Sequence, residues 1–84
     1  MDYILDHDKS LREGFGVVGK SVMTDRNISL GSKALYAYLA SYEGCGAVII
    51  AKVDTCNELN ISSETLDIWL VELKQAGIIN FIKD

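Results

Sequence analysis

A glycine-rich segment near the start of the chain has the spacing of a phosphate-binding loop. Residues 14–21, Gly-Phe-Gly-Val-Val-Gly-Lys-Ser, fit the pattern G-x-x-x-x-G-K-[ST], in which backbone amides and the lysine surround a phosphate. The pattern binds nucleotides when an apolar strand precedes it within a parallel sheet. Residues 9–13, Lys-Ser-Leu-Arg-Glu, are too polar for a buried strand. We therefore interpret the match as accidental and expect no nucleotide.

Metal or nucleophilic chemistry has less support still. His7, the one histidine, lies between two aspartates, and Cys45 and Cys56 stand eleven positions apart. A structural zinc site needs four ligands, commonly in two close pairs. A catalytic cysteine needs a base and a group that orients the base. The sequence therefore predicts a protein that is not an enzyme and has no metal or cofactor. The absence of a disulfide framework favours a reducing, cytoplasmic setting.

The composition describes one small acidic domain. The 84 residues leave room for a single domain, and an apolar fraction of 49% is typical of a globular protein. The formal net charge of -4 argues against coating nucleic acid through bulk charge. The longest apolar run, residues 47–51, is far shorter than the ~20 residues that cross a membrane. We therefore expect no membrane partner.

Hydrophobic periodicity and capping residues predict the helices. A weakly signalled short helix covers residues 20–25, and a strong one begins at Ser29 or Ser32 and ends near residue 42. Another helix spans residues 52–59, and a further one follows the N-cap Ser62 and runs to residue 75. Asn60 tolerates the left-handed conformation that a sharp turn between the last two requires.

Each helix has a predicted inward stripe. The spacing of three and four residues assigns these side chains to the core: Leu35, Tyr38, Leu39 and Tyr42; Val53, Cys56 and Leu59; Leu66, Trp69, Leu70 and Leu73.

Short apolar runs predict strands between and after these helices. Residues 47–50 and 78–82 are rich in β-branched side chains. Residues 1–13 form a polar N-terminal segment in which Tyr3, Ile4 and Leu5 are the candidate strand. We expect this triplet to pair with residues 78–82, whose edge has no partner strand downstream.

The order of helix, strand, helix, tight turn, helix and strand is that of a winged helix-turn-helix. Residues 15–25, 28–30 and 33–42 resemble the N-terminal helix-turn-helix domain of phage and plasmid replication-initiation (replisome organiser) proteins, and residues 59–62 and 73–79 continue the resemblance. It implies an α+β fold over residues 14–84, with three main helices, a short two- to three-stranded sheet and a truncated wing. It also implies binding of double-stranded DNA in replication initiation or transcriptional control.

On this interpretation, DNA contacts come from polar and basic residues on and around the helices. The candidate contacts are Lys20, Arg26, Lys33, Lys52, Ser63, Lys74 and Gln75.

The outward face of the last helix predicts a different kind of partner. At about 100° per residue, Glu64, Ile68 and Val71 lie opposite the inward stripe, with Asp67 beside them. A recognition helix reads bases mainly with Arg, Lys, Asn and Gln, whereas this face is acidic and aliphatic. The alternative hypothesis is a non-enzymatic protein-interaction module that uses these four residues. It would bind a second copy or a basic partner, for example as a phage-encoded inhibitor of a host or defence nuclease.

Overall fold

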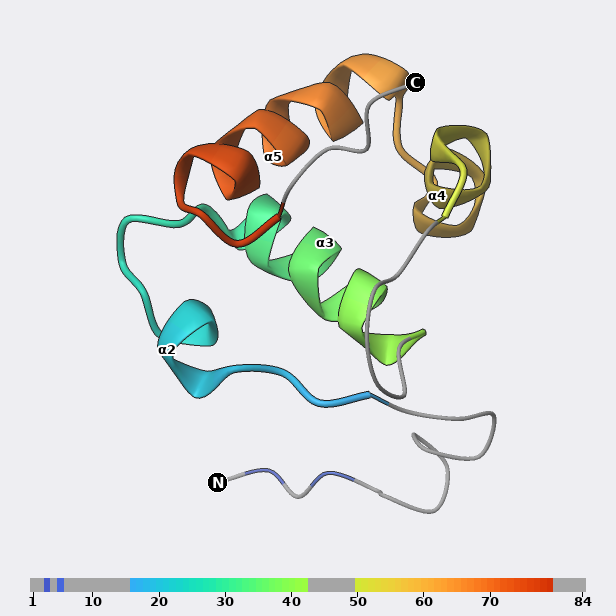
Figure 1. Ribbon diagram of the computed structural model, residues 1–84. Helices are drawn as coiled ribbons and strands as arrows, with labels where there is room; N and C mark the ends of the chain where they lie inside the picture. Colours follow the sequence, from blue (N-terminus) through green and yellow to red (C-terminus); the bar gives the residue numbers. More distant parts are fainter. Residues whose placement is uncertain (1–2, 4, 6–15, 43–49, 80–84) are drawn as a thin grey trace.

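The computed structural model describes residues 3, 5, 16–42 and 50–79 (Figure 1). These residues form four helices: α2 (Lys20–Met23), α3 (Leu30–Ser41), α4 (Lys52–Leu59) and α5 (Ser63–Gln75). Within the described ranges the chain contains no strand. The predicted α+β winged helix with a two- to three-stranded sheet is therefore wrong, and the described part of the fold is all-helical. None of its helices is long and apolar enough to cross a membrane.

Side-chain caps set the starts of the two longest helices. The Ser29 hydroxyl accepts a hydrogen bond from the Ser32 amide at the start of α3, and the Ser62 hydroxyl accepts one from the Thr65 amide at the start of α5. Each bond satisfies one of the four N-terminal amides that a helix leaves without a partner. Both caps confirm the helix starts predicted from the sequence.

The turn between α4 and α5 rests on the backbone of Asn60. Its φ of 55° is left-handed, a conformation that asparagine adopts more readily than most residues. The chain reverses there, and the Ile61 amide donates to the carbonyl of Cys56 at 3.0 Å. The predicted helix, sharp turn and helix over residues 52–75 is thus confirmed.

The core lies where α5 packs against both α3 and α4 (Figure 1). Its buried apolar side chains are Ile28, Leu35, Leu66 and Leu73. Trp69 and Leu70 are half-buried against this cluster. At Gly31 of α3 a methyl group would overlap the Trp69 indole, so glycine permits this close approach of the two helices. The predicted inward stripe of α5 is confirmed.

Two predicted inward side chains are instead exposed. Val53 of α4 is 65% exposed and Tyr42, just after α3, is 55% exposed. The buried side of α4 is centred on Thr55, whose hydroxyl donates to the carbonyl of Ala51. Position 53 lies about 200° away from position 55 around the helix, so Val53 faces outward.

The C-terminal apolar run begins as a helix cap, which is why the predicted strand is wrong at its start. Gly77 has a φ of 77°, its amide donates to the carbonyl of Lys74, and the Ile78 amide donates to that of Leu73. This is a Schellman cap, which brings the following apolar residue back onto the helix. Ile78 and Ile79 accordingly pack against the core.

The predicted pairing of the N-terminal triplet is also wrong where it is described. Tyr3 is 97% exposed and Leu5 is 64% exposed, and neither belongs to a strand. The remaining parts of the predicted strands, at residues 4, 47–49 and 80–82, lie outside the described residues.

Candidate functional site

A shallow depression that is wide open to solvent, called the groove below, lies on the outward face of α5. It has a volume of about 430 Å³ and is lined by Asp67, Ile68, Val71, Glu72 and Gln75. Ile68 is 67% exposed and Val71 is 48% exposed. The structure therefore brings together three of the four residues of the sequence-predicted partner face. The fourth, Glu64, is exposed in the first turn of the same helix but does not line the groove.

Asp67, at one side of the groove, forms a salt bridge with Lys52, one of the candidate DNA contacts. The Lys52 ammonium, at the first residue of α4, lies 3.0 Å from a carboxylate oxygen of Asp67. Both side chains are more than half exposed, so the pair contributes little to stability. Its consequence is electrostatic: a phosphate that approached Lys52 would also approach Asp67.

The second carboxylate of the groove is fixed by the N-terminus of α3. An oxygen of Glu72 accepts a hydrogen bond from the Ser29 amide at 2.7 Å. That bond, with further hydrogen bonding from the Ser32 and Ser29 side chains, holds the pKa of Glu72 below its ordinary value. Glu72 is therefore ionised at neutral pH. Leu30, the next residue after Ser29, is 82% exposed and adds a large aliphatic side chain near this end of α3.

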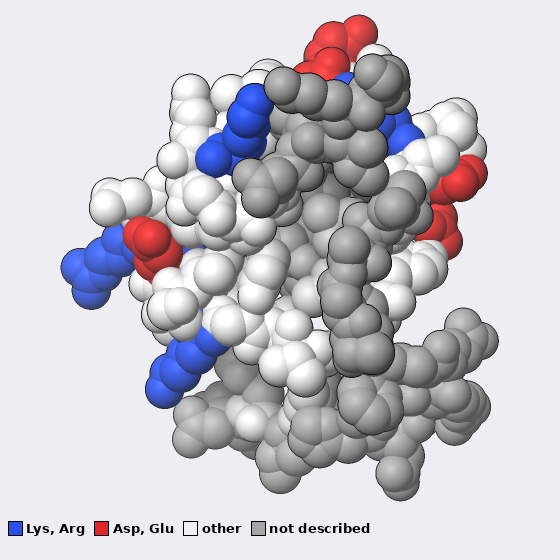
Figure 2. Space-filling model, in the orientation of Figure 1, with Lys and Arg blue, Asp and Glu red and all other residues white. Residues whose placement is uncertain are grey.

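The other candidate DNA contacts are spread over separate elements. Lys20 begins α2, Arg26 lies in the turn after it, and Lys33 is in the first turn of α3. Ser63 begins α5 and Lys74 lies in its last turn. On the face that Figure 2 shows, the Lys and Arg side chains of the described residues stand apart rather than joining into one basic surface. The structure thus places one of the seven predicted contacts, Gln75, in the groove.

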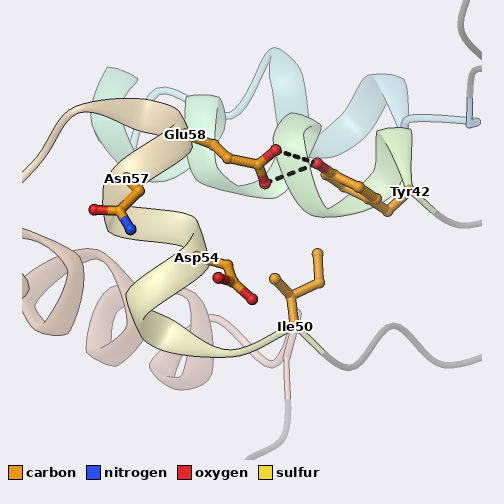
Figure 3. A pocket seen from close by; sticks show the side chains of 5 residues that line it. All are labelled: Tyr42, Ile50, Asp54, Asn57 and Glu58. Atoms are coloured by element: carbon orange, nitrogen blue, oxygen red, sulfur yellow. Dashed lines mark hydrogen bonds between the residues drawn. The ribbon is translucent and has the colours of Figure 1, made fainter.

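A second pocket, which no sequence pattern had indicated, lies between the end of α3 and α4 (Figure 3). The Tyr42 hydroxyl is 2.7 Å from each carboxylate oxygen of Glu58, and the Tyr38 hydroxyl donates to the same carboxylate. The two tyrosine rings meet edge to face at 5.3 Å. Asp54 and Ile50 line the rest of the opening with Asn57. The spacing of four between the tyrosines was visible in the sequence, but their shared partner on another helix was not.

The hydrogen bonds of this cluster stabilise the neutral form of the two tyrosines and the ionised form of Glu58. Burial and the bond to Glu58 raise the pKa of Tyr38, and the bond to Glu58 followed by burial raises that of Tyr42. The same bonds, from Tyr38 first and Tyr42 second, lower the pKa of Glu58. These hydrogen bonds tie the C-terminal end of α3 to α4.

The remaining sequence motifs have no assembled site among the described residues. The amide of Gly19, within the phosphate-loop match, donates to the Tyr36 hydroxyl. Cys56 is a half-buried free thiol. No group of three or more His, Cys, Asp or Glu in the described ranges could hold a metal ion. Gly14, His7 and Cys45 lie outside those ranges.

No family model, curated protein or solved structure matches this chain. The resemblance to replication-initiation proteins thus depends on the sequence motifs alone.

Proposed function

We propose that this chain is a non-enzymatic protein-interaction module that binds a basic partner protein through the outward face of α5. The observation that carries the proposal is the exposure of Ile68 and Val71 over an open groove that also contains two carboxylates. We place the module in the cytoplasm, where the free thiol of Cys56 stays reduced.

The apolar centre of the groove favours contact with protein. Burying apolar surface contributes roughly 25 cal/mol per Å², and exposed apolar patches rimmed by polar groups commonly mark interaction sites. Ile68 and Val71 supply that surface, and both lie on the side of α5 away from Leu66 and Leu73. A partner side chain placed between them would remove them from water.

The charges around this centre favour a basic partner over a second copy. Asp67 and Glu72 line the groove, and the exposed Glu64 lies one turn before Asp67. Two copies meeting through this face would bring these carboxylates together, whereas Lys or Arg on a different protein would complement them. The net charge of -4 adds a long-range attraction for a basic partner.

DNA binding is the second candidate function, and the turn geometry favours it. The left-handed Asn60 makes a tight turn between α4 and α5, and the order of helix, tight turn and helix is shared with DNA-binding helix-turn-helix proteins. In such proteins the second helix enters the major groove and contacts base edges and phosphates. Here that helix would bring Glu64 and Asp67 toward the phosphates, and Lys52 already pairs with Asp67. Repulsion between these carboxylates and the phosphates opposes DNA binding, so we prefer protein binding.

Parallel titrations of the full chain test the two functions. One uses a fluorescein-labelled mixed-sequence DNA duplex of two helical turns at low and moderate salt. The other uses a labelled amphipathic peptide with a leucine stripe flanked by lysines. We expect saturable binding of the peptide and none of the DNA. The double variant Ile68→Ser, Val71→Ser should lose the peptide, and the matched variant Val53→Ser, on the exposed side of α4, should keep it.

Three outcomes would overturn the proposal. Saturable DNA binding that weakens steeply with salt and is lost in Lys52→Ala would establish phosphate contacts instead. Equal binding of the peptide by the double variant would remove α5 from the interface. If sedimentation shows a dimer that the double variant does not form, the face binds a second copy of this chain and not a basic partner.

A further inference from the structure

We infer that the element of the partner that enters the groove is an α-helix, which places a ridge of apolar side chains between two rows of α5 residues. This inference rests on the proposed function, since it names the shape of the partner that the same face binds.

The lining of the groove has the geometry of a helix-packing surface. Asp67, Val71 and Gln75 are spaced by four residues, and Ile68 and Glu72 form a second row with the same spacing. Rows spaced by four form the ridges of a helix surface, and the groove between two ridges accepts a ridge of another helix. From residue 67 to residue 75 the rows extend about 12 Å, at 1.5 Å per residue. That length suits three partner side chains on successive turns.

An extended peptide would fit this face less well. Strand-like peptides gain affinity by pairing their backbone with an exposed sheet edge. The groove is lined by side chains of one helix, whose backbone groups bond within the helix, and the described residues contain no strand. An extended peptide would therefore find no sheet edge to pair with on this face, whereas a helix satisfies its own backbone groups and can bury side chains alone.

The positions of the carboxylates set the charge pattern of the partner helix. Asp67 lies in one row and Glu72 in the other, so acidic groups flank the apolar pair Ile68 and Val71 on both sides. Cations on both flanks of the partner's apolar ridge would therefore meet an opposite charge. A partner cation at Asp67 competes with Lys52, which already lies 3.0 Å away. Glu72, held by the Ser29 amide, keeps a fixed position.

Three labelled peptides of equal length test the inference with the full chain. The first is an amphipathic helix with leucines at every fourth position and lysines beside them. The second has the same residues scrambled so that the leucines share no face, and the third is the first peptide with a central proline. We expect the scrambled peptide to bind at least about tenfold more weakly. The proline peptide should bind about 100-fold more weakly, since an interior proline opposes the helix.

The outcomes separate this inference from the proposed function. If all three peptides bind alike and the variant Ile68→Ser, Val71→Ser loses them all, the face binds basic apolar chains but not specifically helices, and the inference is wrong. If none binds, or the variant binds all three as wild type does, both are wrong. A gain of peptide helicity by circular dichroism on binding to wild type, absent with the folded double variant, would support both.

Discussion

The two faces of α5 both carry branched aliphatic side chains, but these side chains lie in opposite environments. Leu66 and Leu73 on the inward face are 1% and 0% exposed, whereas Ile68 and Val71 on the outward face are 67% and 48% exposed. A surface helix of a globular protein normally has one apolar stripe and a polar opposite face. The inward stripe accounts for the packing of α5 on α3 and α4. Ile68 and Val71 lie outside the described core cluster, and this is the feature on which the proposed protein contact depends.

Replacing Leu73 by alanine should have the largest effect, because it empties space in the centre of the core. Such a change at a buried leucine costs about 2–5 kcal/mol. That is a large share of the stability of a domain of this size. Urea unfolding followed by circular dichroism measures the loss. Ile68→Ala is the matched control on the other face and should stay within about 0.5 kcal/mol of wild type. Equal losses for the two variants would contradict the comparison of faces.

Gly31→Ala should have the next largest effect, through the contact between α3 and the inward flank of α5. The added methyl group overlaps the Trp69 indole, and overpacking of this kind costs about 1–3 kcal/mol. Alanine gains up to about 1 kcal/mol of helix propensity over glycine, so the clash outweighs this gain. Urea unfolding should show a net loss, and the emission of Trp69, the one tryptophan of the chain, should shift.

A second substitution identifies the cause of that loss. In a Trp69→Leu background the indole is absent, and Gly31→Ala should become neutral or stabilising. A persistent penalty there would mean that the backbone at Gly31, rather than its contact with Trp69, resists the change.

The link between α3 and α4 should give a smaller, pH-dependent effect. The pKa of Glu58 is lowered in the folded state by its bonds from Tyr38 and Tyr42. Its contribution to stability is therefore present above the unfolded carboxyl pKa of about 4.3 and is lost as the pH falls through the lower folded value. The difference in urea midpoint between wild type and Glu58→Gln should shrink below about pH 4.

The tyrosines set the alkaline pH limit of the same hydrogen-bonded link between α3 and α4. The pKa values of Tyr38 and Tyr42 are raised, so their contribution is present below the unfolded pKa of about 10 and is lost as the pH rises through the folded values. A difference between wild type and Glu58→Gln that stays constant from acid to alkaline pH would show that the carboxylate adds nothing to this link.

The sequence predicted those features of the fold that local rules determine. The cap at Ser62, the start of α3 at Ser29 (one of the two serines predicted for it) and the left-handed Asn60 each depend on side chains acting on neighbouring backbone groups. The buried positions Leu66 and Leu73 follow from helical periodicity. The prediction of a strand at Ile78 was wrong because a β-branched run also suits a Schellman cap, and only the packing distinguishes the two.

In the candidate site, too, the features set by one helix were predicted from the sequence, and the contacts between helices were not. The outward orientation of Asp67, Ile68 and Val71 follows from periodicity within one helix. The pair between Lys52 and Asp67 joins residues 15 positions apart, and the bond from Ser29 to Glu72 joins residues 43 apart. Such pairings depend on how the helices pack, which no local pattern encodes.

The smallest effect should come from the double variant Ile68→Ser, Val71→Ser. Exposed positions outside the core usually change the free energy of unfolding by less than about 0.5 kcal/mol each, and Ile68 and Val71 are outside the core cluster of the described residues. Serine has a helix propensity close to those of isoleucine and valine, so α5 itself should persist. Urea unfolding should therefore give a midpoint near that of wild type, and circular dichroism should show the same helix content. A loss comparable to that of Leu73→Ala would mean that Ile68 and Val71 pack within the molecule. The outward face of α5 would then be a structural surface, and the proposal that it binds a partner would be wrong.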